Sequence, residues 1–416
     1  MSRSAAIDST TGIAREHRTD SRWTGWITVV VAAVIMMATL PGRTQGLGLI
    51  TEPMLRDLRL DRVSYATVNL WATLLGAAIC LPIGRVFDRA GLATTTALLT
   101  ALLALVVWTM SGLTGGVLAL FGLVLATRAL GQSALSVSSI TAVGKAFDRT
   151  VGVAMGVYSV LLTILFAAAF TAVGTSVGVN GWRTAWAQVA LGLILVAPAA
   201  FLLREHRGQA ASEPAGGTSL TLAMALHTPA FWVFAGATSL FGLVSSGLGL
   251  FNEAVLAERG FDQSTYVTFL TVTTVIGLAG QLGCGWLSMR WPMPRLLGVA
   301  MFFYSAALFM LPSVSTPLEL WTFASLIGLS GGMVTVIFFA VWRRGFGPGH
   351  LGRIQGAAQM LTVLASAIGP LIFAESVTRM GSYFPAIWML APSVLIVSVV
   401  AFRVQLPVLD AQEVQR

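Results

Sequence analysis

Long apolar runs separated by short polar segments fill almost the whole 416-residue chain. A helix needs about 20 apolar residues to cross about 30 Å of hydrocarbon, and such runs recur from Trp26 to Phe402. Gly, Pro and charged residues punctuate the runs and mark helix ends. The predicted helices cover residues 26–52, 64–86, 93–112, 116–141, 151–175, 182–203, 230–256, 265–288, 296–312, 318–341, 353–377 and 384–404. The pattern therefore predicts an all-α membrane protein with twelve transmembrane helices.

The longest polar stretch after the N-terminal tail, RGQAASEPAGGTS over residues 207–219, divides these helices into two sets of six. Its Gly, Pro and Ser content is typical of a flexible linker. We expect five parts: a cytoplasmic tail (1–25), a six-helix bundle (26–203), a cytoplasmic linker (204–229), a second six-helix bundle (230–404) and a cytoplasmic C-terminal tail (405–416).

The two sets of helices are related by internal repetition. Residues 46–89 align with residues 247–290 at a constant offset of 201 without a gap, and 15 of the 44 positions are identical. The pairs include the GLGL segments at 46–49 and 247–250, Glu52 with Glu253, and Asp61 with Asp262. Parallel duplication predicts two bundles related by a pseudo-two-fold axis, with a cavity between them.

Composition and charge agree with this interpretation. Hydrophobic residues make up 56% of the chain and charged residues 10%, whereas soluble domains carry about 25% charged residues. With the N-terminus inside, 17 of the 25 basic residues fall on the inner side, six on the outer side and two within helices. This positive-inside bias predicts cytoplasmic termini in a plasma (inner) membrane and accounts for the net charge of +8 without a nucleic-acid partner.

Catalytic chemistry, metals and cofactors are not expected. Cys80 and Cys284 lie in different halves, which makes a disulfide or a metal centre improbable. The four histidines fall in loops or tails. No nucleophile and base stand at a plausible spacing, and no loop has the pattern of a phosphate-binding loop, so we do not expect an enzyme.

Several motifs resemble those of the major facilitator superfamily along nearly the whole chain. GRVFDRAG at 84–91 is similar to the family's loop between helices 2 and 3, with Gly84, Asp88, Arg89 and Gly91 in matching positions. RALGQ at 128–132 resembles the family's arginine motif in helix 4. The resemblance implies the twelve-helix fold of that family, secondary active transport by alternating access, and a gating role for the four loop residues.

Within the family, residues 41–62 look most like the first helix and outer loop of the oxalate/formate exchanger and monocarboxylate porter branch. In that branch a basic residue of helix 1 contributes to carboxylate binding, a role that the resemblance gives to Arg43. Helix 8 carries no basic residue here, although several members of the branch use one.

Charges inside the membrane are the first candidates for function, because each costs about 3 kcal/mol on insertion scales. Arg43 and Arg128 are such charges, and no mid-span acid neutralises them. Polar stripes on helices 2, 4, 8 and 11 could line a wet pathway or could hold helices together. The expected substrate-binding residues are Arg43, Arg128, Gln132, Tyr65, Asn69, Tyr266, Gln281, Gln355 and Gln359. Guanidinium groups suit a small organic anion such as a mono- or dicarboxylate.

Three glutamates stand near the outer ends of helices. The repeated pair Glu52 and Glu253 is expected to form part of an outer gate, and Glu253 or Glu375 could carry a co-transported proton. Two alternatives stay open. Proton-coupled efflux of amphipathic drugs would need an adaptable apolar cavity and a titrating acid, and a non-transporting membrane sensor would need a folded signalling domain.

Overall fold

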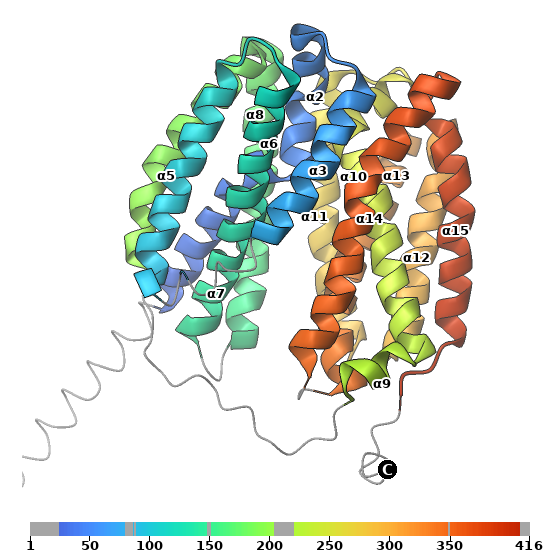
Figure 1. Ribbon diagram of the computed structural model, residues 1–416. Coiled ribbons are helices and arrows are strands. Elements are labelled where there is room, and N and C mark those ends of the chain that lie inside the picture. Colours follow the sequence, from blue (N-terminus) through green and yellow to red (C-terminus); the bar gives the residue numbers. More distant parts are fainter. Residues whose placement is uncertain are drawn as a thin grey trace, which may run out of the picture.

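The computed structural model of the protein describes residues 25–79, 86, 89–147, 151–203, 220–347 and 350–407, and helices are the main regular structure throughout these segments (Figure 1). Nine helices in this part of the chain are long and apolar enough to span a membrane. One of them, Ala154–Leu202, contains two passes joined at Gly181, where φ is +82°. The broken first helix and the helix after it complete the twelve predicted passes. The all-α prediction is confirmed.

The N-terminal half begins with a discontinuous pass. Its first segment is Gly25–Ala38 and its second is α2 (Thr44–Leu58), with a 3-10 turn at Leu40–Gly42 between them. The remaining elements are α3 (Arg62–Ile79), α5 (Leu92–Ser111), α6 (Val117–Thr127), a π-helix (Arg128–Leu135), α7 (Ser136–Ala146), α8 (Val151–Val196) and a 3-10 helix (Ala197–Leu202).

The C-terminal half repeats the arrangement with continuous helices. A short helix, α9 (Leu222–Leu226), lies within the expected linker range. It is followed by α10 (Pro229–Ala257), α11 (Gln263–Leu287), α12 (Met293–Met310), α13 (Pro317–Phe346), α14 (Leu351–Met380) and α15 (Phe384–Arg403). Figure 1 shows the two halves side by side, with α5 and α8 on one flank and α12 and α15 on the other.

The repeated aspartates start equivalent helices. Asp61 accepts a hydrogen bond from the backbone N–H of Ser64 at 2.8 Å, and Asp262 accepts one from Thr265 at 2.9 Å. Each carboxylate thus caps the first turn of α3 or α11, where N–H groups lack helical partners. The hydrogen bonds from Ser64 also hold the pKa of Asp61 below its ordinary value.

The halves touch through three pairs of helices: α2 with α10, α3 with α14, and α8 with α11. We call the side on which α2 ends and α3 begins the distal side, and the side of Leu203 and Leu220 the linker side. The closest contacts between the halves lie toward the distal side, where Gly48 meets Gly249 and Gly174 meets Val267. Thr171 and Thr271 also share a hydrogen bond of 3.0 Å there. The described structure is therefore closed on its distal side.

Two predicted helix boundaries were wrong. The range 26–52 was expected as one helix, but the chain leaves the helical conformation at Thr39–Arg43 and then continues to Leu58. Pro41 has no backbone N–H to donate and is followed by Gly42, and the two residues together favour a turn at this point. The expected gap at 176–181 is also helical up to Gly181, because a single glycine with positive φ makes the whole turn.

Candidate functional site

The break in the first helix creates an unpaired backbone carbonyl near the middle of the pass. Arg43 is extended, with φ −89° and ψ 151°, and it serves as the N-cap of α2. Within the turn, the N–H of Gly42 donates to Thr39 and the N–H of Arg43 donates to Leu40. The carbonyl oxygen of Gly42 receives no backbone donor in the described structure. Because lipid supplies no hydrogen bonds, such a group needs a partner inside the protein.

Arg128 supplies that partner. Its Nη1 donates to the Gly42 oxygen at 3.0 Å, to Thr44 Oγ1 at 3.1 Å and to Gln132 Oε1 at 2.5 Å. Its Nη2 donates to Asn69 Oδ1 at 2.9 Å. The side chain is only 2% exposed, and no described carboxylate lies within 4.0 Å of it. Arg128 therefore holds the broken helix with neutral partners through both terminal nitrogens, while its Nε is buried without a partner.

Glycines allow the backbones to approach each other around Arg128. A Cβ on Gly42 would lie 2.2 Å from the carbonyl oxygen of Thr127, and one on Gly131 would lie 3.3 Å from the Cα of Gly42. Arg128 and Gly131 both belong to the π-helical segment Arg128–Leu135. Segments of this kind are rare and occur frequently at functional sites. The widened turn and the glycines together seat the fourth pass directly against the break.

Arg43 has a different environment. Its Nε donates to Thr39 Oγ1 at 2.7 Å and its Nη2 donates to Ser136 Oγ at 3.3 Å. The guanidinium also lies 5.1 Å from the ring centroid of Phe166 on α8, a cation–π contact. The side chain is half-buried, Nη1 has no partner among the described residues, and none of their carboxylates pairs with it. Each arginine therefore keeps one nitrogen without a partner: Nη1 on the half-buried Arg43, and Nε on Arg128, where that atom is buried.

The two arginines at membrane depth, Arg43 and Arg128, both belong to the N-terminal half. At the repeat offset of 201, Arg43 corresponds to Val244 and Asn69 to Leu270, and both are buried. At these positions the C-terminal half thus has buried aliphatic side chains where the N-terminal half has Arg43 and Asn69.

Comparisons with known proteins agree with this architecture. The sequence model of the Major Facilitator Superfamily matches residues 24–370. The chain belongs to the Major Facilitator Superfamily. It is therefore a multi-pass membrane transporter and not an enzyme, as the sequence predicted.

Solved structures of similar fold include two transporters of this superfamily. A point mutant of the nucleoside transporter NupG has a TM-score of 0.73 at 14% identity, covering 91% of this chain and 99% of that one. A bacterial homolog of the human lysosomal transporter Spinster, in an inward-facing and unoccupied conformation, has a TM-score of 0.68 at 15% identity, covering 91% and 95%. At such identities the likeness concerns the fold. No curated protein sequence matches significantly.

The other predicted site residues of this superfamily member fall into separate groups. Gln132, Tyr65 and Asn69 lie near Arg128 in the N-terminal half, with Tyr65 0% exposed. Tyr266 lies on the distal side beside Gly48 and is 1% exposed. The other three predicted residues are Gln281, half-buried where α11 packs on α13, Gln355, half-buried on α14, and Gln359, exposed on α14.

The predicted gating and proton-coupling residues lie in different parts of the structure. Glu52 pairs with Arg62 at 2.7 Å on the distal side, and Glu253 occupies the equivalent place on α10. Arg89 is exposed, and Gly91, with φ +80°, starts α5. Gly84 and Asp88 lie outside the described residues. Glu375 forms a 2.6 Å ion pair with Arg379 on its own helix.

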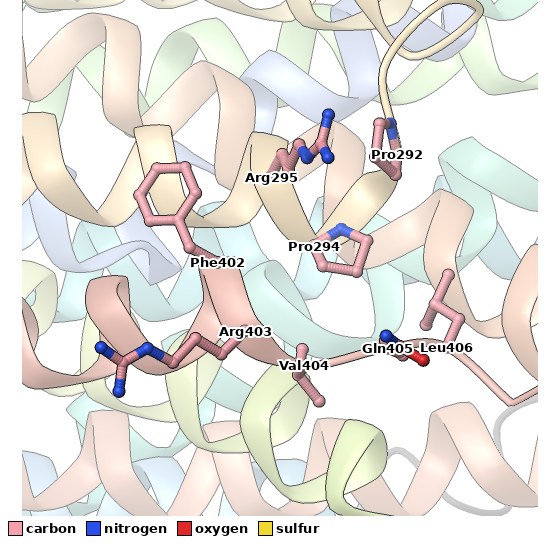
Figure 2. A pocket seen from close by; sticks show the side chains of 8 residues that line it. All are labelled: Pro292, Pro294, Arg295, Phe402, Arg403, Val404, Gln405 and Leu406. Atoms are coloured by element: carbon pink, nitrogen blue, oxygen red, sulfur yellow. The ribbon is translucent and has the colours of Figure 1, made fainter.

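A pocket of about 300 Å³ lies on the linker side, between the start of α12 and the end of α15 (Figure 2). Arg295 and Arg403 contribute its charges, and Phe402 forms part of its apolar wall. None of its lining residues belongs to the predicted site. It is separate from the arginines at the break.

Several site features escaped the sequence prediction. The break at Pro41-Gly42, the π-helix and the contact of Arg43 with Phe166 were not expected. The Pro-Gly dipeptide was the available signal for the break, since such a pair ends or kinks a helix. The π-helix and the cation–π contact leave no comparable mark in the sequence.

Proposed function

We propose that this transporter moves a small organic anion across the membrane by alternating access, with Arg43 as the residue that binds the anion. The free Nη1 of Arg43 carries the proposal. A guanidinium at membrane depth with no described counter-ion favours an anionic ligand, and its planar donors match a carboxylate. Because Arg128 is occupied by Gly42, Thr44, Gln132 and Asn69, one guanidinium remains, which favours a monocarboxylate over a dicarboxylate.

The aliphatic residues of the other half support an amphipathic ligand. Val244 and Leu270 stand at the positions equivalent to Arg43 and Asn69. A carboxylate on the N-terminal half with an apolar body toward the C-terminal half would use both surfaces. The asymmetry between the repeats then orients the ligand.

The positive-inside bias supports an orientation in which the linker side faces the cytoplasm of a cell with this protein in its plasma membrane. In that orientation the distal side faces outward and is closed by α2 against α10, α3 against α14, and α8 against α11. The described state then corresponds to an inward-facing conformation, and rocking of the halves exposes Arg43 to each side in turn.

The test combines ligand binding with transport. Purified protein is screened by thermal shift against monocarboxylates, dicarboxylates, nucleosides and amphipathic drugs, since a ligand of the folded state raises its apparent stability. The best ligand is then used in proteoliposome uptake assays. We expect a monocarboxylate to bind and Arg43→Gln to weaken its binding by about 10-fold to 100-fold, the range for a lost charge-assisted hydrogen bond.

Arg290→Gln is the matched control, because Arg290 is an exposed arginine on the linker side that contacts Trp286. It should keep full binding and uptake. Transport of a nucleoside or a drug that is unchanged in Arg43→Gln would contradict the anion proposal while leaving the protein a transporter. Efflux of drugs with no carboxylate binding would favour the alternative of drug export.

A further inference from the structure

The two glutamates repeated at positions 52 and 253 face each other across the closed distal side. Gly48 and Gly249, at equivalent places of the repeat, are in direct contact there. Each glutamate lies four residues, or about one helical turn, beyond its glycine. The two carboxyl groups interact electrostatically as a result. The duplication has thus brought two acids together at the pseudo-two-fold axis.

The cations on this side form ion pairs with Glu52, and Arg56 also interacts electrostatically with Glu253 from a longer distance. Arg62 Nη2 donates to Glu52 Oε2 at 2.7 Å, and Arg56 Nη2 lies 4.0 Å from the same oxygen with its side chain 79% exposed. Glu52 is 4% exposed. Glu253 has no basic partner within 4.0 Å among the described residues. An unpaired carboxylate beside a buried ion pair is unfavourable, since burial of a charge without compensation is costly.

Buried polar groups around the acids also lack partners. Oε1 of Glu52 and Oε2 of Glu253 accept no hydrogen bond from the described residues. The hydroxyl of Tyr266, on α11, is buried without a partner and interacts electrostatically with Glu253. The hydroxyl of Tyr383, before α15, has no hydrogen bond of good geometry, but it lies near the Arg62 guanidinium and interacts electrostatically with Glu52, Arg62 and Glu258. An added donor at the acids would satisfy an orphaned oxygen.

We infer that Glu52 and Glu253 form a proton-binding site that exists only when the distal side is closed. A proton on Glu253 removes the unpaired charge and provides an O–H donor toward Glu52, so the pair keeps one negative charge, which Arg62 balances. Opening the distal side separates the acids and exposes Glu253 to water. A hydrated carboxyl group is ionised at neutral pH, so Glu253 then releases its proton. Closure of the distal side therefore takes up one proton.

A proton-binding site of this kind makes closure of the distal side depend on pH in one direction. The closed state binds one proton more than the open state, so closure is favoured as pH falls, by up to tenfold per pH unit. The ionisable groups near the pair are Arg56 on α2, Arg62 on α3, Glu258 directly after α10, Tyr266 on α11 and Tyr383 before α15. Neither Glu253 nor Glu258 has a described basic partner within 4.0 Å, but Glu258 accepts hydrogen bonds from Ser382 and from the Tyr383 backbone, whereas the buried Oε2 of Glu253 accepts none.

The experiment measures distal closure without any substrate. Nitroxide labels at Asn180→Cys and Ser264→Cys, exposed residues on opposite halves, report the distal distance in a protein whose Cys80 and Cys284 are replaced by Ser. Pulsed electron paramagnetic resonance in lipid nanodiscs measures the distance between the two labels at several pH values from about 5 to about 8. This range lies above the ordinary pKa of a carboxyl group. We expect the short distance to gain population as pH falls.

Variants locate the proton. Glu253→Gln mimics the protonated acid and should keep the short distance at every pH, and Glu375→Gln, the matched control, should retain the wild-type response. Glu52→Gln frees Arg62 to pair with Glu253, so the response should again disappear; this variant serves if Glu253→Gln does not fold. A wild-type distance that is independent of pH, or a full response in Glu253→Gln, would overturn the inference. Neither outcome depends on Arg43 or on the identity of the substrate.

Discussion

Gly48 of α2 lies against the backbone of Gly249 of α10, so closely that a Cβ on Gly48 would stand 2.2 Å from the Gly249 carbonyl oxygen. The two glycines are partners in the internal repeat, at the offset of 201. The contact is not symmetric, because a Cβ on Gly249 would meet side-chain atoms only, at ordinary distances of 3.5 Å from Thr44 Cγ2 and 3.8 Å from Gln45 Cγ. The closed distal side therefore requires glycine at position 48, whereas position 249 has room for a methyl group.

Gly48→Ala should open the distal side. The added methyl group cannot fit while α2 touches α10, and overpacking of this kind costs about 1–3 kcal/mol. The penalty falls on the closed state, so its population relative to the open state should fall by about 10-fold to 100-fold. The label pair at residues 180 and 264 measures this directly. Gly249→Ala is the control and should stay closed, and equal effects of the two variants would refute the asymmetric contact.

Arg128→Met should destabilise the fold without abolishing ligand binding. It leaves the Gly42 carbonyl without its side-chain donor in an apolar environment, which costs about 1–3 kcal/mol. Thermal unfolding in detergent should show a lower midpoint, and residual folded protein should still bind the ligand that Arg43 recognises.

Arg43→Met provides the comparison for Arg128→Met. Arg43 is half-buried with a free donor, so its removal should leave the unfolding midpoint nearly unchanged and reduce ligand binding. If the two variants exchanged these effects, with binding lost at residue 128 and stability lost at residue 43, the proposed division of roles would be wrong.

The fold could be predicted from the sequence because its signals are local and repeated. Apolar runs fix the passes, and the gapless match of 46–89 with 247–290 fixes the relation of the halves. The roles of the two arginines could not be predicted in the same way. Arg128 is occupied by Gly42, 86 residues away, and by Asn69, 59 residues away. Only the packing of three passes decides which guanidinium has both terminal nitrogens occupied by neutral acceptors.

The break in the first helix shows the limit of periodicity. The residues before Pro41-Gly42 are mostly apolar, and after the short polar segment 43–45 the apolar run resumes at Gly46, so hydropathy alone predicts one pass across the turn. Proline is tolerated within membrane helices when neighbouring groups satisfy the freed carbonyls. Pro53 within α2 and Pro370 within α14 are examples of continuous helices here. The same residue type therefore marks a break at position 41 and no break at positions 53 and 370.

Gly332→Ala should weaken the C-terminal half. A Cβ at Gly332 on α13 would stand 2.1 Å from the Gly277 carbonyl oxygen on α11, so the helices would have to separate. Small residues at such positions allow the close packing on which membrane helices depend. We expect a loss of about 1–3 kcal/mol in unfolding free energy, measured by chemical denaturation in mixed micelles.

Gly283→Ala is the control for that helix pair, since a Cβ on Gly283 would meet no atom within 4 Å. It should leave stability unchanged or raise it slightly, because alanine is the better helix former. A Gly332→Ala variant as stable as Gly283→Ala would mean that α11 and α13 do not pack as described.

Asp57 should stabilise the distal end of the N-terminal half through two different interactions. Its Oδ2 accepts from Trp182 Nε1 at 3.0 Å and pairs with Arg183 Nη2 at 2.8 Å, while Arg183 Nη1 donates to the Ser111 carbonyl at 3.1 Å. The cluster ties the end of α2 to the start of the sixth pass and to the end of α5. Because Asp57 and Arg183 are 45% and 36% exposed, solvent screens their attraction, and exposed pairs contribute at most about 1 kcal/mol.

Two substitutions of Asp57 separate these contributions. Asp57→Asn keeps an acceptor for Trp182 and removes the charge, whereas Asp57→Ala removes both. We expect Asp57→Asn to lower the thermal midpoint only at low ionic strength, because about 1 M salt screens the ion pair in the wild type as well. Asp57→Ala should lower the midpoint at both salt concentrations, since the indole N–H then has no acceptor. Equal midpoints for the two variants at high salt would show that the bond from Trp182 contributes nothing to stability, and the tie would then rest on the ion pair alone.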